Sequence, residues 1–142
     1  MLNPNQFGGQ LQLLTPDEPR FLNQIDDLVN SINPNEIDSI YPYVFSFFAK
    51  YPEIEMGNPG TLVHAVEKFY PNYLAVLKTS LSSCPSITAV LMAHRILNSQ
   101  LAENERQELL GLLSVIASSE KVPRSISLEA SELLEFQRNK TT

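Results

Sequence analysis

The stretch "GNPGTLVHAVEKFY" (residues 57–70) presents a choice between a ligand-binding loop and the start of a helix. It lacks the lysine and the Ser/Thr of a phosphate-binding loop, and it lacks G-x-G-x-x-G spacing. Asn58-Pro59 is instead a helix cap followed by a proline, and Gly57 and Gly60 predict a tight entry turn before the helix. The apolar residues that follow predict the buried side of a helix: Leu62, Val63, Val66, Phe69 and Tyr70.

Similar start signals occur earlier in the chain. Thr15-Pro16 with Glu18, and Asn33-Pro34 with Glu36, place a capping residue, a proline and a glutamate in capping-box order, which predicts helix starts near 16 and 34. Pro42 interrupts the second pattern, so we expect a break near Tyr41. The aromatic residues that follow predict either core packing or, in part, a partner surface.

Later stretches predict helices that start near 73, 86, 103 and 125. The helix starting at 86 is apolar on nearly all sides, which is typical of a buried, central helix. Residues 1–14 have no helical stripe and predict an extended arm. The fold expected is a single all-α domain over 1–142 with six to eight helices. The starts at 59 and 86 are 27 residues apart, which is compatible with HEAT-like stacked helical hairpins as the arrangement of these helices.

Composition narrows the class of protein. With 142 residues and 43% hydrophobic content, the chain can form one packed core. One cysteine excludes an internal disulfide and a cysteine metal knuckle. The first 20 residues lack the basic cluster and apolar run of a signal peptide, and no apolar run reaches membrane-spanning length. A cytoplasmic protein is the simplest interpretation.

The charge is unevenly distributed along the chain. The formal net charge is −6, and residues 1–60 alone hold eight acidic and two basic residues. A negative field repels nucleic acid and attracts basic partners, so we expect no nucleic acid as partner. The lack of a membrane-length apolar run likewise leads us to expect no membrane as partner. An acidic surface that only interacts with water is the alternative interpretation.

The residues that could carry chemistry are few. His64, Glu67 and His94 could form a metal site or an acid–base pair, but the chain has no H-E-x-x-H and no G-x-S-x-G. We therefore predict no catalytic residue, no metal and no cofactor. A structural use is favoured instead: Glu67 pairs with Arg95, with His64 and Asn98 nearby, and holds two helices in register.

Two blocks of the sequence form a recognisable pattern. The first consists of Gly57, Pro59, Gly60, Val63, His64, Glu67 and Lys68, and the second of Pro85, Val90, Arg95, Ile96, Asn98 and Ser99. This pattern, which covers residues 57–99 and is moderately specific, resembles that of a group of small bacterial immunity proteins that accompany polymorphic toxins, including those of contact-dependent growth inhibition systems.

The resemblance implies a protein that is not an enzyme but binds a cognate toxin domain, often a nuclease, and blocks its active site. Charge then favours a partner-binding surface outside the matched blocks, formed by Asp26, Asp27, Glu36, Asp38, Glu53 and Glu55 with Tyr43 and Tyr51 as aromatic anchors. The main alternative is a helical adaptor that binds another basic protein or a peptide. A small metal-dependent or acid–base enzyme and a DNA-binding regulator are the further alternatives.

Overall fold

Apolar residues at helical spacing fold into α-helices in the computed structural model, which describes residues 1–57 and 59–140. The helices are α1 (Pro4–Leu11), α2 (Phe21–Asn30), α3 (Tyr41–Lys50), α4 (Thr61–Glu67), α5 (Leu74–Ser83), α6 (Ile87–Leu97), α7 (Glu103–Ser118) and α8 (Arg124–Lys140), with a 3₁₀ turn η1 (Ile37–Ser39). Within these residues, the only extended pairing is a single bridge between Leu2 and Ile32. The predicted all-α fold of six to eight helices is confirmed.

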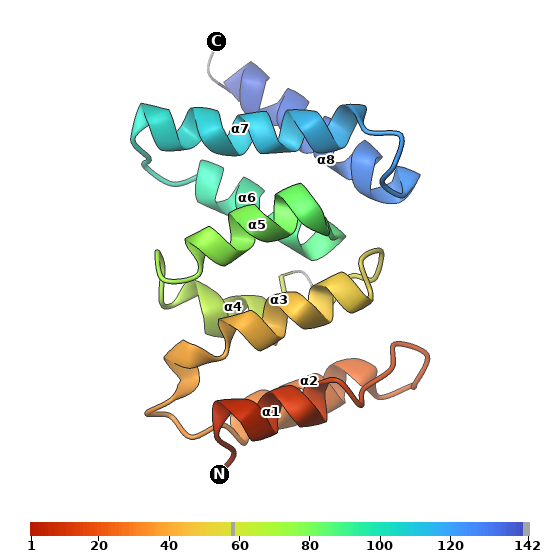
Figure 1. The fold of residues 1–142 in the computed structure, drawn as a ribbon, viewed down its shortest axis with the longest axis vertical. Helices are drawn as coiled ribbons and strands as arrows, with labels where there is room; N and C mark the ends of the chain where they lie inside the picture. The colour runs from red at the N-terminus through yellow and green to blue at the C-terminus, as the bar shows by residue number, and fades with distance from the viewer. Residues whose placement is uncertain (58, 141–142) are drawn as a thin grey trace.

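The helices follow one another along the long axis in chain order, with α1 and α2 at one end and α7 and α8 at the other (Figure 1). Odd-numbered helices pack on each other, α1 on α3, α3 on α5 and α5 on α7. Among the even-numbered helices, α2 packs on α4 and α6 packs on α8. The predicted likeness to HEAT-like hairpins stays a prediction.

The buried apolar side chains form one cluster that runs from Phe7 in α1 to Leu134 in α8. Helix α6 lies inside it, packed against α3, α5, α7 and α8. Its buried residues occupy more than one side of the helix, as predicted: Thr88, Ala89, Val90, Met92, Ala93, Ile96 and Leu97. In the described part of the chain, no helix combines the length and the apolar character needed to cross a membrane.

The predicted extended arm over residues 1–14 is wrong, because α1 occupies most of it. Asn3 caps the helix by accepting from the backbone N–H of Gln6 at 2.8 Å, and the Gln6 side chain accepts from the backbone N–H of Asn3 at 3.0 Å. Phe7 and Leu11, one turn apart, are fully buried. This capping box and a two-residue apolar stripe stabilise a short helix despite two glycines.

The first predicted helix starts later than its signals indicate. Thr15 does not cap a helix; its carbonyl accepts from the Glu18 N–H in a turn, and α2 begins at Phe21. A helix capped by Thr15 would need the fourth residue after it, Pro19, to donate to the Thr15 carbonyl, and proline has no N–H. Pro19 therefore moves the start of the helix to Phe21.

The segment after Asn33-Pro34 also forms less helix than the sequence predicted. The Asn33 side chain accepts from the Asn35 N–H at 3.1 Å, and the chain then forms turns and η1 rather than a full helix. The predicted break near Tyr41 is confirmed, since α3 begins at Tyr41 with Pro42 in its first turn. Proline fits there because the first-turn N–H groups have no partner inside the helix.

The entry turn of α4 depends on its two glycines, as predicted. Gly57 and Gly60 have φ of 111° and 93°, a region that other residues rarely adopt. A Cβ on Gly60 would overlap the backbone of Met56, whose side chain is buried. Helix α4 begins at Thr61 rather than near 59, and the predicted cap Asn58 lies outside the described residues.

Candidate protein-binding surface

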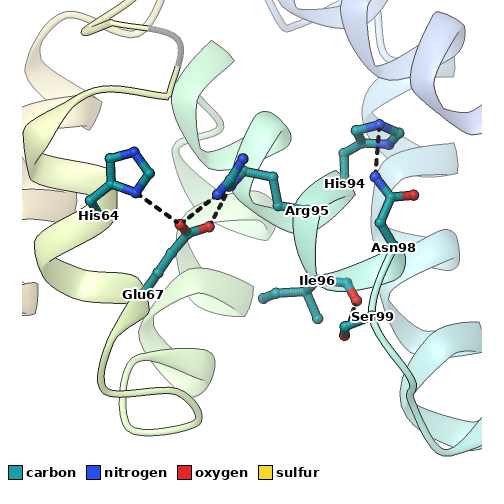
Figure 2. A network of polar contacts seen from close by, with 7 residues as sticks. All are labelled: His64, Glu67, His94, Arg95, Ile96, Asn98 and Ser99. Carbon is teal, nitrogen blue, oxygen red and sulfur yellow. Dashed lines mark hydrogen bonds and ion pairs between the residues drawn. The ribbon is translucent and has the colours of Figure 1, made fainter.

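The polar residues of α4 and α6 meet in an ion pair. Arg95 donates from Nε to Glu67 Oε2 at 2.6 Å and from a terminal nitrogen to Glu67 Oε1 at 2.9 Å. His64, one turn before Glu67, has its Nδ1 3.9 Å from the same carboxylate. Figure 2 shows these three side chains directed toward one another. The predicted pairing of Glu67 with Arg95 is confirmed.

This pair is half-buried rather than fully buried. The Glu67 side chain is 20% exposed and that of Arg95 is 37% exposed. The hydrogen bonds that Arg95 donates to Glu67 raise the pKa of Arg95, which keeps the guanidinium charged. Buried Tyr73 lies beside the pair, and burial, with the charge of Glu67 as a smaller cause, raises its pKa to about 12. A two-bond pair of this kind fixes α4 relative to α6.

The predicted place of Asn98 is wrong, because Asn98 belongs to a second network on the other side of α6 (Figure 2). Its side-chain oxygen accepts from Gln137 Nε2 at 2.8 Å and from Lys140 Nζ at 3.0 Å, both on α8. Its side-chain nitrogen lies 3.4 Å from His94 Nε2. Around the helix, Arg95 and Asn98 are only about 60° apart, but Asn98 is the residue that caps the C-terminal end of α6, where its side chain reaches α8.

Gln137 is the centre of this second network and is fully buried. Its side-chain nitrogen lies 3.1 Å from His94 Nδ1, and its side-chain oxygen accepts from Arg106 at 3.3 Å. Arg106 also donates to the carbonyl of Leu97 at 3.1 Å. Gln137 was not predicted from the sequence, although it continues the spacing of the buried α8 residues Ile126, Ala130 and Leu134. A glutamine at a position of the apolar stripe of a helix is the sequence signal that could have identified it as a buried polar residue.

His94 packs in this network with its ring edge-on to Phe136, at 5.4 Å between centroids. Burial lowers its pKa from the usual 6.5, and the positive charge of Lys140 lowers it further. His64, Glu67 and His94, the residues considered for acid–base chemistry, therefore do not converge. Among the described residues, no group of three or more His, Cys, Asp or Glu side chains is placed to hold a metal ion.

The loop before α4 and one face of α8 both carry glutamates where the two segments meet. Ser125 of α8 donates to Glu53, and the charges of Glu132 and Glu55 both act on Glu129. Burial is the largest cause that raises the pKa of Glu129, followed by Glu132 and then Glu55. We call Glu53, Glu55, Glu129 and Glu132 the acidic edge. Glu53 and Glu55 belong to the surface predicted from the sequence, whereas Glu129 and Glu132 were not predicted.

The other predicted acidic residues lie elsewhere. Asp26 and Asp27 are exposed on α2, and Asp26 accepts from Thr61 at the start of α4. Asp38 is exposed in η1 and lines a shallow groove with Tyr41 and Asn72. Glu36 is half-buried, and its Oε2 is buried without a hydrogen-bond partner within the described residues. These acids therefore stand on several elements, and their proposed role at a partner surface stays a prediction.

The two predicted aromatic anchors contribute to helix packing. Tyr43 is half-buried, lies against Gly8 of α1, and its hydroxyl donates to Asn5 at 3.4 Å. Tyr51 is half-buried as well, stands edge-on to Phe47, and its hydroxyl donates to the Leu14 carbonyl at 3.3 Å. The Tyr43 hydroxyl joins the first turn of α3 to the N-terminal segment, and the Tyr51 hydroxyl joins the end of α3 to it. Their proposed contact with a partner stays a prediction.

Comparison of the chain with models of protein families, with curated proteins and with solved structures found no match.

Proposed function

We propose that this protein is an immunity protein that binds a cognate bacterial toxin domain and covers its active site with an acidic surface. The toxin domain that fits this proposal best is a basic nuclease. The observation that supports this most directly is the acidic edge, where the charges of Glu55 and Glu132 act on Glu129 and where Ser125, one turn before Glu129, donates to Glu53. Placing like charges side by side costs stability in the free protein, and a positively charged partner would remove that cost.

The charge of the whole chain supports the same partner class. The net charge is −6, and nuclease domains commonly carry basic clefts for their substrate. An acidic protein can occupy such a cleft in place of the phosphates, and complementary charge raises the rate of association. The half-buried pair Glu67–Arg95 and the Gln137 network act as scaffold in this proposal. They hold the helices that carry the acidic residues.

The experiment is co-expression with the C-terminal domain of a toxin encoded beside this gene. We expect that domain to stop growth alone and to be harmless with this protein. The variant E53K/E55K should lose protection and bind the purified domain at least about tenfold more weakly. D17K/E18K, which makes the same change of charge at exposed residues before α2, is the matched control.

Two results would count against the proposal. Full protection by E53K/E55K would remove the acidic edge from the interface. A basic partner that is harmless on its own would instead favour the helical adaptor.

A further inference from the structure

A groove lies beside the acidic edge, where the loop before α4 approaches α6 and α8. It has a volume of about 160 Å³ and is lined by Glu55, Gly57, Ile87, Thr88, Leu91 and Glu129. Small-molecule sites usually occupy about 300–1,000 Å³, so this groove has the scale of one side chain. On the α6 side its wall is formed by the apolar Ile87 and Leu91 with Thr88 between them, and the loop before α4 and α8 each add a carboxylate.

We propose that this groove receives a lysine or arginine side chain of the basic partner, with the cationic end at Glu55 and Glu129. The inference rests on the proposed function, since it takes the partner to be a basic protein. The aliphatic stem of a long basic side chain packs well on apolar surface while its charged end reaches polar groups. Ile87 and Leu91 offer that surface, and both are half-buried in the free protein.

An exposed aromatic residue stands on the same face of α8. Phe136 lies seven residues after Glu129 and four after Glu132, which places all three on one side of the helix. Phe136 is 54% exposed, although its ring rests on His94. Binding energy in protein interfaces concentrates at buried aromatic and arginine anchors. A partner whose basic side chain enters the groove would cover Phe136 with the residues beside it.

The first experiment needs no partner. The ¹⁵N-labelled protein is titrated with N-acetyl-arginine N-methylamide and followed by NMR. We expect weak, saturable shifts at the amides of Gly57, Thr88, Leu91 and Glu129. E55Q/E129Q should weaken the binding at least about fivefold, whereas D17N/E18Q, which removes the same charge elsewhere, should leave it unchanged. Equal shifts with the uncharged N-acetyl-citrulline N-methylamide, equal weakening in D17N/E18Q, or no shifts at these amides would overturn the proposal.

The substitutions should leave the fold intact. Glutamine has the shape of glutamate, and burial already disfavours the charged form of Glu129 by raising its pKa. Thermal unfolding of E55Q/E129Q checks this, and its melting temperature should equal or exceed that of the parent protein.

The second experiment separates this inference from the proposed function. With the toxin domain in hand, E55Q/E129Q should bind it at least about tenfold more weakly than D17N/E18Q does. Unchanged affinity would overturn the groove as the binding site while leaving the immunity function in place. If no toxin domain binds the parent protein, the proposed function fails, and the arginine titration alone decides the groove.

Discussion

The ion pair between Glu67 and Arg95 joins α4 to α6, and a substitution in it shows how much free energy of unfolding a half-buried pair contributes. Removing one partner of a fully buried pair costs about 3–5 kcal/mol, and an exposed pair contributes about 0–1 kcal/mol. Because both side chains keep some contact with water, we expect Glu67→Gln to lower the free energy of unfolding by about 1–2 kcal/mol. Urea unfolding measures this value.

Glu108→Gln is the matched control for that measurement. Glu108 pairs with Lys78 at 3.0 Å but is 54% exposed, so its loss should cost less than about 0.5 kcal/mol. Equal effects of the two substitutions would place Glu67–Arg95 among ordinary surface pairs.

His94 gives the protein a pH dependence of stability. Its pKa is lowered in the folded state, first by burial and then by Lys140, so the unfolded chain binds this proton more tightly. The stability from the neutral ring is therefore complete above about pH 6.5 and is lost as the pH falls below that value toward the folded pKa. We expect the free energy of unfolding to decrease between pH 7.5 and pH 5.5.

Substitution of each histidine tests the origin of this decrease. His94→Gln should reduce the slope of stability against pH, and His64→Gln, at an exposed position, should leave the contribution of His94 in place. An unchanged slope in His94→Gln would show that another group is responsible.

Residue pairing was only partly predictable from the sequence. Arg95 is the one charge in an apolar helix, and a charge there needs a partner, which made Glu67 a reasonable choice. Asn98 was assigned to the wrong network because spacing gives the direction of a side chain but not the element it meets. Glu129 and Glu132 were missed because Ser125 and Glu53 meet across 72 positions of sequence.

At the scale of elements, the stability that α1 contributes distinguishes a packed N-terminal helix from an extended arm. Phe7 is fully buried in the core, so Phe7→Ala should cost about 3–5 kcal/mol. Leu13→Ala, at a side chain that is 79% exposed, should cost less than about 0.5 kcal/mol. Thermal or urea unfolding of both variants measures the difference, and a small effect of Phe7→Ala would restore the extended arm.

The helices that the sequence predicted best are those with long apolar stripes, with a side-chain cap as in α6 or without one as in α7. Ser86 accepts from the Ala89 N–H at 3.0 Å and starts α6 where expected, and α7 starts at Glu103 as expected. Errors fell where prolines cluster. A proline at the first helical position favours a helix start, as Pro16 does after Thr15, but a proline three residues later prevents it, as Pro19 does. Helix α1 was missed because two turns carry too few apolar residues for periodicity to register.

At the scale of the whole molecule, negative charge should govern the encounter with the partner. Long-range attraction is screened over about 10 Å at 0.1 M salt, so it acts mainly on the association rate. We expect the association rate constant with the toxin domain to fall at least about tenfold between roughly 0.02 M and 0.5 M salt, with a smaller change in dissociation. Stopped-flow mixing measures both constants, and an association rate independent of salt would contradict this view.

The order of the helices along the long axis has a consequence for synthesis of the chain. Helices that pack closely are near neighbours in sequence, α1 with α2 and α3, and α7 with α8 (Figure 1). Chains with such local packing fold quickly, and domains can fold from the N-terminal end while the ribosome is still translating. The first helices can therefore assemble before α8 has left the exit tunnel. The acidic edge, which needs Glu129 and Glu132, can be completed only after α8 has emerged as well.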